Sequence, residues 1–539
     1  MKSILFLLTT SLLFAKDIEI ISYDWVGHFG YVNYNGSLMW NKDWKSGPYF
    51  FDGTWSNNPG LMGPEIKDGF LNRFQDTIHF DTSKVTSYFE YVQGDYLQDE
   101  FSTAADYNGD GRHIRIHGFK RSYAGKYSQY VPSGMLPRPI HQTYAVQYKS
   151  EKEFEKINAA IGHFNTYSGL PDTVNKALYN SRITSNNLYW EKPFGDFTPN
   201  ISANHFLQML KSDFSYTDSL GGFSESFKQA RYLTRSKYSG KLKWYKDKQM
   251  NLFLKFELNN RGVRLDKLRN EQWKNYLIGI EYENFSVSGG LVSVADESKF
   301  LWDFYFNLSR NNYTLRIYHN QIPKPAHPYF KRPGILTSSY LTGAFGKIIM
   351  GRWNLSVSAN QVKYLSNFSQ SNPDSILNYY PVDDENLSIG VALDFQLIRF
   401  MKIMLKYIHQ DGNSLISDGV EQRLKIAGLG SFSLFNGIMK IGTNIEFHKW
   451  FNRKQRGFLL PVEAIPVPHD YSNLNDIWFV NAKINAHVSS ITISYTWHNL
   501  SEIILDASGY NIKNDLVIHP LMPEMGRQAS MIISWDFLD

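Results

Sequence analysis

The sequence has no cysteine among its 539 residues. Neither a disulfide framework nor the lipid anchor of a lipoprotein is therefore available to it. Beyond the first fifteen residues it also lacks an apolar run near twenty residues, so it predicts no membrane-spanning helix. No stretch is dense in lysine and arginine, and the net charge is only +5, which argues against nucleic acid as a partner.

Motifs of the common enzyme classes are also missing. There is no Gly-x-Ser-x-Gly elbow, no His-Glu-x-x-His, no Walker loop and no Gly-x-Gly-x-x-Gly opening a helix. We expect a protein that is not an enzyme and has no cofactor. A hydrolase embedded in a barrel is the least favoured alternative, because a Ser–His pair is recognised by geometry rather than by spacing.

The N-terminus has the form of a secretory signal peptide. Lys2 is followed by an apolar run from Ile4 to Phe14 and then by Ala15, Lys16 and Asp17. A basic start, a short apolar core and a small residue before a charged one predict cleavage near Ala15. We therefore expect a signal peptide at 1–15 and a barrel domain at 16–539.

The last three hundred residues show stretches of alternating apolar and polar residues that come in pairs. Within a pair the join is a few residues, as at 309–312, 351–352, 435–437 and 489–490. Between pairs it is longer, as at 259–274, 320–338, 365–385, 411–422, 449–475 and 500–527. Short turns at one end, long loops at the other and one apolar face per strand are typical of a transmembrane β-barrel. Lipid cannot hydrogen-bond to the backbone, so a sheet crosses it only as a closed barrel.

The alternation has a period of two, which excludes helices. Leu387, Ile389 and Val391, for example, alternate with Ser388 and Gly390. About fifteen such strands lie from residue 236 onward, and seven more are expected near 25–35, 84–97, 113–124, 142–149, 153–164, 183–191 and 201–211. The sequence therefore predicts an all-β fold, a closed antiparallel barrel of about 20–22 strands with short periplasmic turns, long extracellular loops and both termini in the periplasm.

Aromatic residues make up 16% of the chain, and many lie near the expected strand ends. Two bands of aromatics suit anchors at the two membrane interfaces better than a stacking surface for sugars. Trp244, Tyr313, Trp353 and Trp535 belong to the short-turn band, whereas Trp450, Trp478 and Trp497 belong to the long-loop band.

Residues 36–83 show no sustained period and contain several glycines and prolines, which break strands. This segment is either a long outer loop or a segment folded into the lumen.

Charged residues on the polar faces of the strands are the candidates for solute selectivity. We expect six of them to face the lumen, where half of all barrel positions are polar. These candidates are Asp303, Arg316, Asp394, Lys440, Glu446 and Lys483.

One motif offers a possible metal site. Asp106, Asn108 and Asp110, followed by Gly111, match the first half of a calcium loop, although His117 stands where a glutamate should close it. The alternative is a tight hairpin turn, in which Asn-Gly and Asp-Gly are favoured for their positive φ.

The C-terminal region carries a resemblance to a known family. Pro523-Glu524-Met525-Gly526-Arg527 precedes an alternating strand that ends in Trp535-Asp536-Phe537. This arrangement resembles the last loop and strand of TonB-dependent receptor barrels. The resemblance implies a 22-stranded outer-membrane barrel and recognition of the terminal strand by the outer-membrane assembly machinery. The sequence shows neither the TonB box of that family nor a segment long enough for its plug, and Leu538 and Asp539 follow the terminal aromatic.

These observations predict an integral outer-membrane barrel in contact with lipid that passes a small solute, in the manner of a porin. The alternative is a plug-less relative of a TonB-dependent receptor that acts as a binding or assembly protein.

Overall fold

The computed structural model describes residues 18–22, 25, 30–34, 37–39, 66–67, 70–71, 84–127, 140–152, 154–169, 177–214, 229–245, 250–264, 268–321, 323–325, 336–337, 339–370, 379–411, 419–459, 466–508, 516–518 and 523–538. The expected signal peptide at 1–15 and most of 36–83 lie outside these residues.

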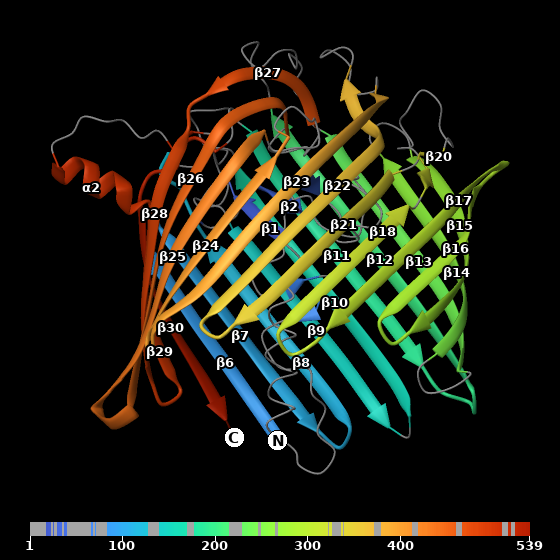
Figure 1. The fold of residues 1–539 in the computed structure, drawn as a ribbon, viewed down its shortest axis with the longest axis horizontal. Coiled ribbons are helices and arrows are strands. Elements are labelled where there is room, and N and C mark those ends of the chain that lie inside the picture. The colour runs from blue at the N-terminus through green and yellow to red at the C-terminus, as the bar shows by residue number, and fades with distance from the viewer. Residues whose placement is uncertain are drawn as a thin grey trace.

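Twenty-two antiparallel strands close into one barrel (Figure 1), which confirms the fold expected from the sequence. Strands that are neighbours in the wall follow one another in the sequence. The ring closes where the last wall strand, β30, pairs with the first, β6. The first half of the wall consists of β6 (Lys84–Gly94), β7 (Gln98–Gly109), β8 (Arg112–Ser122), β9 (Ile140–Lys152), β10 (Glu155–Gly169), β11 (Ala177–Glu191), β12 (Phe197–Phe214), β13 (Gln229–Tyr245), β14 (Met250–Arg264), β15 (Leu268–Tyr282) and β16 (Phe285–Val294). The second half consists of β17 (Glu297–Ser309), β18 (Tyr313–Gln321), β21 (Ser339–Met350), β22 (Trp353–Gln370), β23 (Tyr379–Ile398), β24 (Met401–Gln410), β25 (Val420–Leu434), β26 (Met439–Leu459), β28 (Ile477–Val488), β29 (Ile491–His498) and β30 (Gln528–Leu538).

The two faces of each strand differ as a membrane barrel requires. In β8, His113, Arg115 and His117 are buried, whereas Ile114 and Ile116 between them are exposed. Apolar side chains are thus exposed on the outside, where lipid solvates them, and polar side chains line the inside. Closure leaves no unpaired strand edge in the wall.

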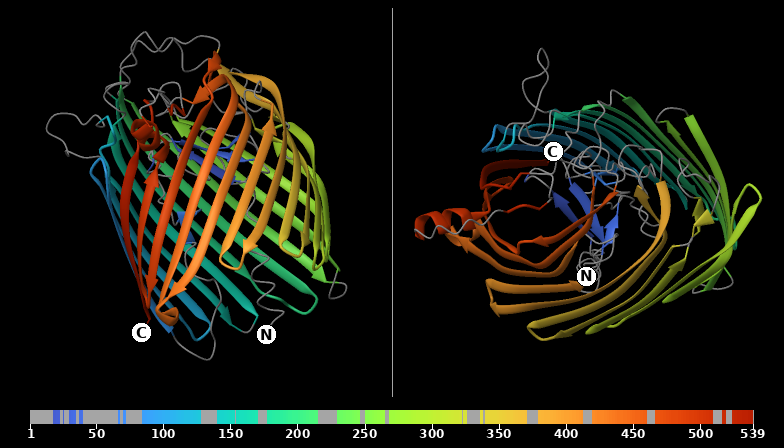
Figure 2. Two further views of the ribbon diagram at one scale, coloured as in Figure 1. Left: turned by 60° about the vertical axis from the view of Figure 1, so that its left-hand side comes forward. Right: turned by 90° about the horizontal axis from the view of Figure 1, so that it is seen from above.

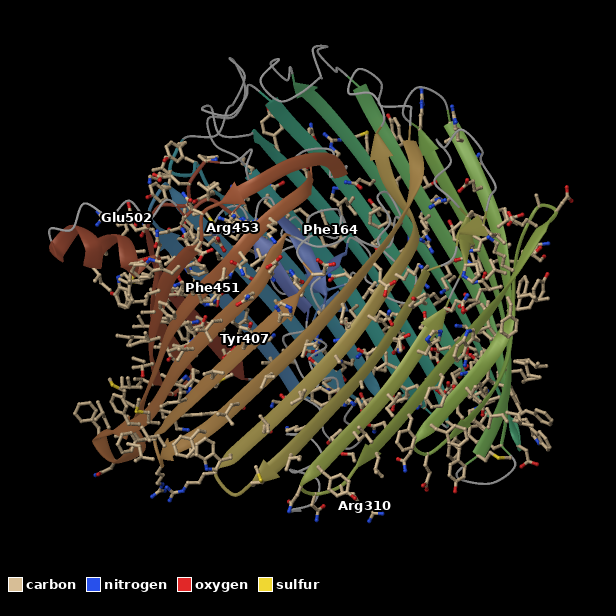
Figure 3. The ribbon with its side chains drawn as sticks, turned by 45° about the horizontal axis from the view of Figure 1, so that its top comes forward. Phe164, Arg310, Tyr407, Phe451, Arg453 and Glu502 are labelled. Carbon is tan, nitrogen blue, oxygen red and sulfur yellow. The ribbon has the colours of Figure 1, made fainter. Side chains whose placement is uncertain are left out.

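The connections alternate as predicted, with some differences. Turns such as 283–284, 351–352 and 489–490 define the short-turn end, and segments such as 499–527 define the long-loop end. Figure 3 shows Arg310 at the short-turn end and Glu502 at the opposite end. The prediction of a long loop at 259–274 is wrong, because β14 continues to Arg264 and β15 begins at Leu268. Strands that extend past the expected membrane layer replace that loop.

Part of the N-terminal segment lies inside the ring. β1 (Ile18–Ser22), β2 (Gly30–Tyr34) and β3 (Ser37–Met39) form a separate three-stranded sheet, which both views of Figure 2 place within the barrel. The expectation of a wall strand near 25–35 is therefore wrong. The wall strand absent from the prediction is β7, whose outward face includes Thr103 and Ala105 and whose inward face includes Ala104. Because small residues lie on both faces of β7, its sequence lacks the alternation of apolar and polar side chains by which the other strands are predicted.

Short elements complete the described chain. They are β4 (Ile66–Lys67) with β5 (Phe70–Leu71), β19 (Lys324–Pro325) with β20 (Leu336–Thr337), β27 (Pro466–Leu474) beside the outer part of β26, the 3₁₀ turn η4 (Phe435–Gly437), and helix α2 (Leu500–Ser508). Helix α2 projects from the wall beside β28 (Figure 1). Among the described residues, no helix has the length and hydropathy needed to cross a membrane.

Aromatic side chains gather at the short-turn end as expected. Trp244, Tyr313, Trp353 and Trp535 are exposed close to short turns. Trp450 is an exception, because it is buried on the inner face with its ring centroid 6.3 Å from that of Phe479. It is therefore not an interface anchor.

Candidate lumenal site

The inner face of β7 and β8 carries a buried polar network. The carboxylate of Asp106 contacts His113 Nε2 and lies 3.2 Å from Arg115 Nε. Ser102 Oγ lies 3.1 Å from His117 Nε2 on the same face. A buried charge is tolerated only when it is paired, which explains why Asp106 has two basic neighbours.

The three calcium candidates lie around one hairpin turn. Asp106 faces the network just described, whereas Asp110 Oδ2 accepts a hydrogen bond from Tyr107 at 3.1 Å. Asp110 and Gly111 both have positive φ, as a tight hairpin requires. Among the described residues, no group of three or more His, Cys, Asp or Glu side chains is placed to hold a metal. Calcium at Asp106, Asn108 and Asp110 stays a prediction.

Asp303 and Arg316 lie on neighbouring strands and bind neutral partners. Asn320 Nδ2 donates to Asp303 Oδ1 at 3.0 Å, and Arg316 Nε donates to Asn307 Oδ1 at 3.1 Å. Because each partner lies directly across the strand pair, these contacts follow from the register of β17 and β18.

The other four candidates belong to β23, β26 and β28. Lys402 Nζ lies 2.9 Å from Asp394, and Glu446 accepts contacts from Lys425 at 2.9 Å and His448 at 3.1 Å. Lys440 and Lys483 form no ion pair within the described part of the chain. The six candidates are therefore spread along the inner wall and do not converge on one site.

An aromatic cluster joins the internal N-terminal segment to the wall. The Trp25 ring stacks on His498, with centroids 4.8 Å apart and planes at 11°, and meets Phe479 edge-on at 5.9 Å. Trp25 Nε1 also donates to the carbonyl oxygen of Gly526 at 2.7 Å. Phe479 in turn stacks on His448 at 4.6 Å. The sequence analysis missed this cluster, since nothing in the spacing connects residue 25 with residue 526.

The Pro523–Arg527 segment binds side chains at the seam between β30 and β6. Glu524 accepts hydrogen bonds from Lys126 Nζ at 2.7 Å and Tyr127 Oη at 2.9 Å, and Tyr96 Oη donates to Arg527 O at 2.7 Å. Burial lowers the pKa of Lys126, but the hydrogen bond and charge of Glu524 outweigh this effect and raise the pKa above its ordinary value. The motif that carries the family resemblance thus contacts the β6–β7 turn and the segment after β8, beside the pairing of the first and last strands.

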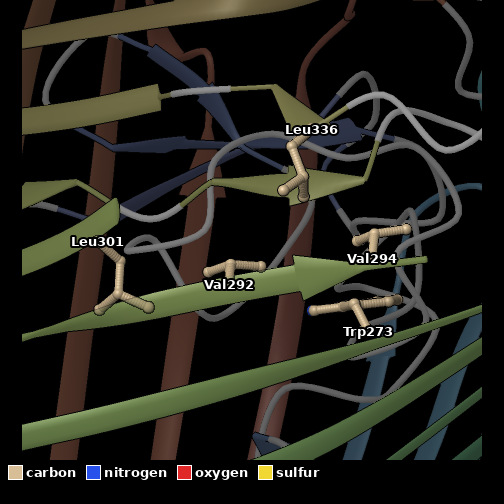
Figure 4. Close-up of a cluster of buried hydrophobic side chains, with 5 residues drawn as sticks. All are labelled: Trp273, Val292, Val294, Leu301 and Leu336. Atoms are coloured by element: carbon tan, nitrogen blue, oxygen red, sulfur yellow. The ribbon is translucent and has the colours of Figure 1, made fainter. Parts of the chain in front are cut away.

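A small apolar cluster covers another part of the inner wall (Figure 4). Trp273, Val292, Val294 and Leu301 come from β15, β16 and β17, and Leu336 comes from β20. The backbone N–H of Leu336 donates to Glu297 Oε2 at 2.9 Å, and its carbonyl oxygen accepts from Lys299 Nζ. The connection between β18 and β21 is therefore fastened to the inside of the wall.

Comparison with known proteins identifies the fold and leaves the family open. No protein-family model matches the chain, and no curated protein matches it in sequence. Solved structures do match in three dimensions. The FrpB iron transporter from Neisseria meningitidis aligns with a TM-score of 0.65 at 10% identity, over 98% of this chain and 96% of that one.

Two other neighbours have similar scores. The ferripyoverdine receptor of the outer membrane of Pseudomonas aeruginosa aligns with a TM-score of 0.64 at 10% identity, over 96% of this chain and 83% of that one. The copper transporter OprC aligns with a TM-score of 0.64 at 10% identity, over 96% and 94% of the two chains. The expected resemblance to TonB-dependent receptors is thereby confirmed for the fold.

Proposed function

We propose that this protein is an integral outer-membrane barrel of the receptor type that takes up a small solute. The observation that carries the proposal is a closed 22-stranded barrel whose own N-terminal strands lie inside it, fastened to the wall through Trp25. The fold of the neighbours supports a receptor-like reading over the plain porin that the sequence analysis put first. Their names refer to iron, ferripyoverdine and copper, so a metal or its chelate is the solute class to test first.

In this proposal the described N-terminal strands β1, β2 and β3 act as a small lumenal insert. The short-turn end and both termini would face the periplasm, and the assembly machinery would recognise β30, which completes the ring. The neighbours' names describe transporters and receptors, which supports a role other than catalysis.

The test compares cells with and without the gene for uptake of radiolabelled iron chelates and copper, with the TonB system present or disabled. Energy-dependent uptake that requires the gene supports the receptor function. Uptake that is equal in both strains for every solute contradicts it. A large, steady single-channel current from the purified protein would favour the passive porin instead.

A further inference from the structure

Lysine side chains recur on the inner face of the wall in the strands from β13 to β28, in the half of each strand nearer its short turn. Lys241 and Lys243 lie at the end of β13, and Lys347 lies at the end of β21. Lys402 and Lys440 are the second residues of β24 and β26. Together with Lys255 and Lys483 these residues form what we call the lysine surface.

We place these lysines on the lumenal face, because the residues next to them in the sequence are exposed on the outer face. Leu242 and Trp244 flank Lys243, and Ile348 follows Lys347, and all three are exposed apolar residues on the outer face. Ile484 likewise follows Lys483. Since side chains alternate along a strand, the lysines take the opposite, inner face.

Too few carboxylates lie on this surface to neutralise it. Glu257 is shared by Lys237 at 3.1 Å and Lys255 at 2.6 Å. Glu281 is likewise shared by Lys241 at 2.5 Å and Lys243 at 3.5 Å.

On the neighbouring strands Asp394 contacts Lys402 at 2.9 Å. Among the described residues Lys347, Lys440 and Lys483 form no ion pair, and the same Asp394 attracts Lys347 only at longer range. Positive charge therefore remains in excess along this side of the lumen.

We propose that the short-turn half of the lumen favours anionic solutes, namely small molecules that carry carboxylate or phosphate groups. A cavity lined by one sign of charge raises the local concentration of the opposite ion, and lysine-lined constrictions select anions. This inference rests on the proposed uptake function and specifies the charge of its solute.

The experiment measures binding of inorganic tripolyphosphate to the full-length detergent-solubilised protein by calorimetry at low ionic strength. A triple variant, Lys347→Gln, Lys440→Gln and Lys483→Gln, removes the three lysines without ion pairs. The matched control, Lys120→Gln, Lys152→Gln and Lys274→Gln, removes the same net charge at exposed lysines outside the lysine surface. Heat-modified gel mobility shows that each variant is folded.

We expect the lysine-surface variant to bind about tenfold more weakly than the wild type, and the control by less than about twofold. Added salt should reduce wild-type binding, because the interaction is electrostatic. Absent wild-type binding, or equal weakening in the two variants, overturns the inference. If the gene makes no difference to the uptake of any solute, yet the lysine-surface variant still binds tripolyphosphate more weakly than the control, the receptor function is refuted and the anion preference stands.

Discussion

Trp25 and Gly526 are separated by 501 positions in the sequence, yet the indole N–H of Trp25 donates to the carbonyl oxygen of Gly526 at 2.7 Å. This hydrogen bond links the internal N-terminal segment to the segment before the last strand. His498 and Phe479 complete the contact from β29 and β28. The described N-terminal residues are thus attached to the wall close to the seam of the ring.

Replacing Trp25 should release this contact. Trp25→Ala removes the hydrogen bond and the ring contacts, so we expect about 1–3 kcal/mol less stabilisation of the docked segment. Backbone amides of β1 to β3 should exchange hydrogen faster, as measured by mass spectrometry. Trp244→Ala, which removes an outward-facing ring, is the matched control. Unchanged exchange in Trp25→Ala would show that the segment is held elsewhere.

The seam should weaken at high pH through Lys126 and Tyr127. Glu524 raises the pKa of Lys126 above 10.5 in the folded state, so the ion pair stabilises the fold fully below that pH. The stabilisation is lost as the pH rises through the folded pKa. Burial and the hydrogen bond to Glu524 also raise the pKa of Tyr127, whose ionisation then removes its donated proton.

This pH dependence is measured against Glu524→Gln by thermal unfolding between pH 8 and pH 12. Wild type should be more stable than the variant at pH 8, and the difference should shrink toward pH 12. A difference that stays constant across this range would exclude the proposed role of Lys126 and Tyr127.

A charge on the outer wall should destabilise the barrel far more than a charge in the lumen. Ile278 is 62% exposed on the outer face, so Ile278→Arg should cost about 2–4 kcal/mol in a bilayer. Tyr305→Arg places the same charge at an inner position that is 38% exposed and should cost little. Denaturant unfolding in liposomes measures both, and similar losses would mean that the assignment of the two faces is wrong.

Gly290 should not tolerate a side chain. A Cβ atom there would collide with the backbone carbonyl group of Tyr276 on the neighbouring strand. Gly290→Ala should therefore push β15 and β16 apart and lower the free energy of unfolding by about 1–3 kcal/mol. Gly346→Ala is the control, because a Cβ at Gly346 meets nothing within 4 Å. Denaturant unfolding of the two variants should differ, and equal stability would contradict the close approach.

The sequence predicts the number of strands better than their identity. The expected wall strand near 25–35 and the absence of β7 from the prediction are two errors that cancel, so the predicted total agrees with the structure although one strand is misplaced. Alternation indicates which face a residue occupies, and this is why Leu387 and Ser388 can be assigned to opposite faces. Alternation carries no information on whether a strand belongs to the wall or to a sheet within it.

The candidate site was less accessible to sequence reasoning. The six lumenal candidates could be chosen by their faces, but their partners depend on the register between strands. Glu446 meets His448 and Asn444 on its own strand, which spacing can suggest, whereas its contact with Lys425 needs the pairing of β25 with β26. Trp450 was misplaced because an aromatic near a strand end suits either face.

The pairing of β30 with β6 constrains the order of biogenesis. β1 to β3 lie within the ring and are synthesised before every strand of the wall, whereas β30, which completes the ring, is synthesised after the other wall strands. A curved, open sheet must therefore exist before the cylinder does, and it either encloses the early strands as its edges meet or admits them through an open mouth afterwards. Trp25 can reach Gly526 only after synthesis has passed residue 526, which places this contact after the synthesis of every earlier strand of the wall.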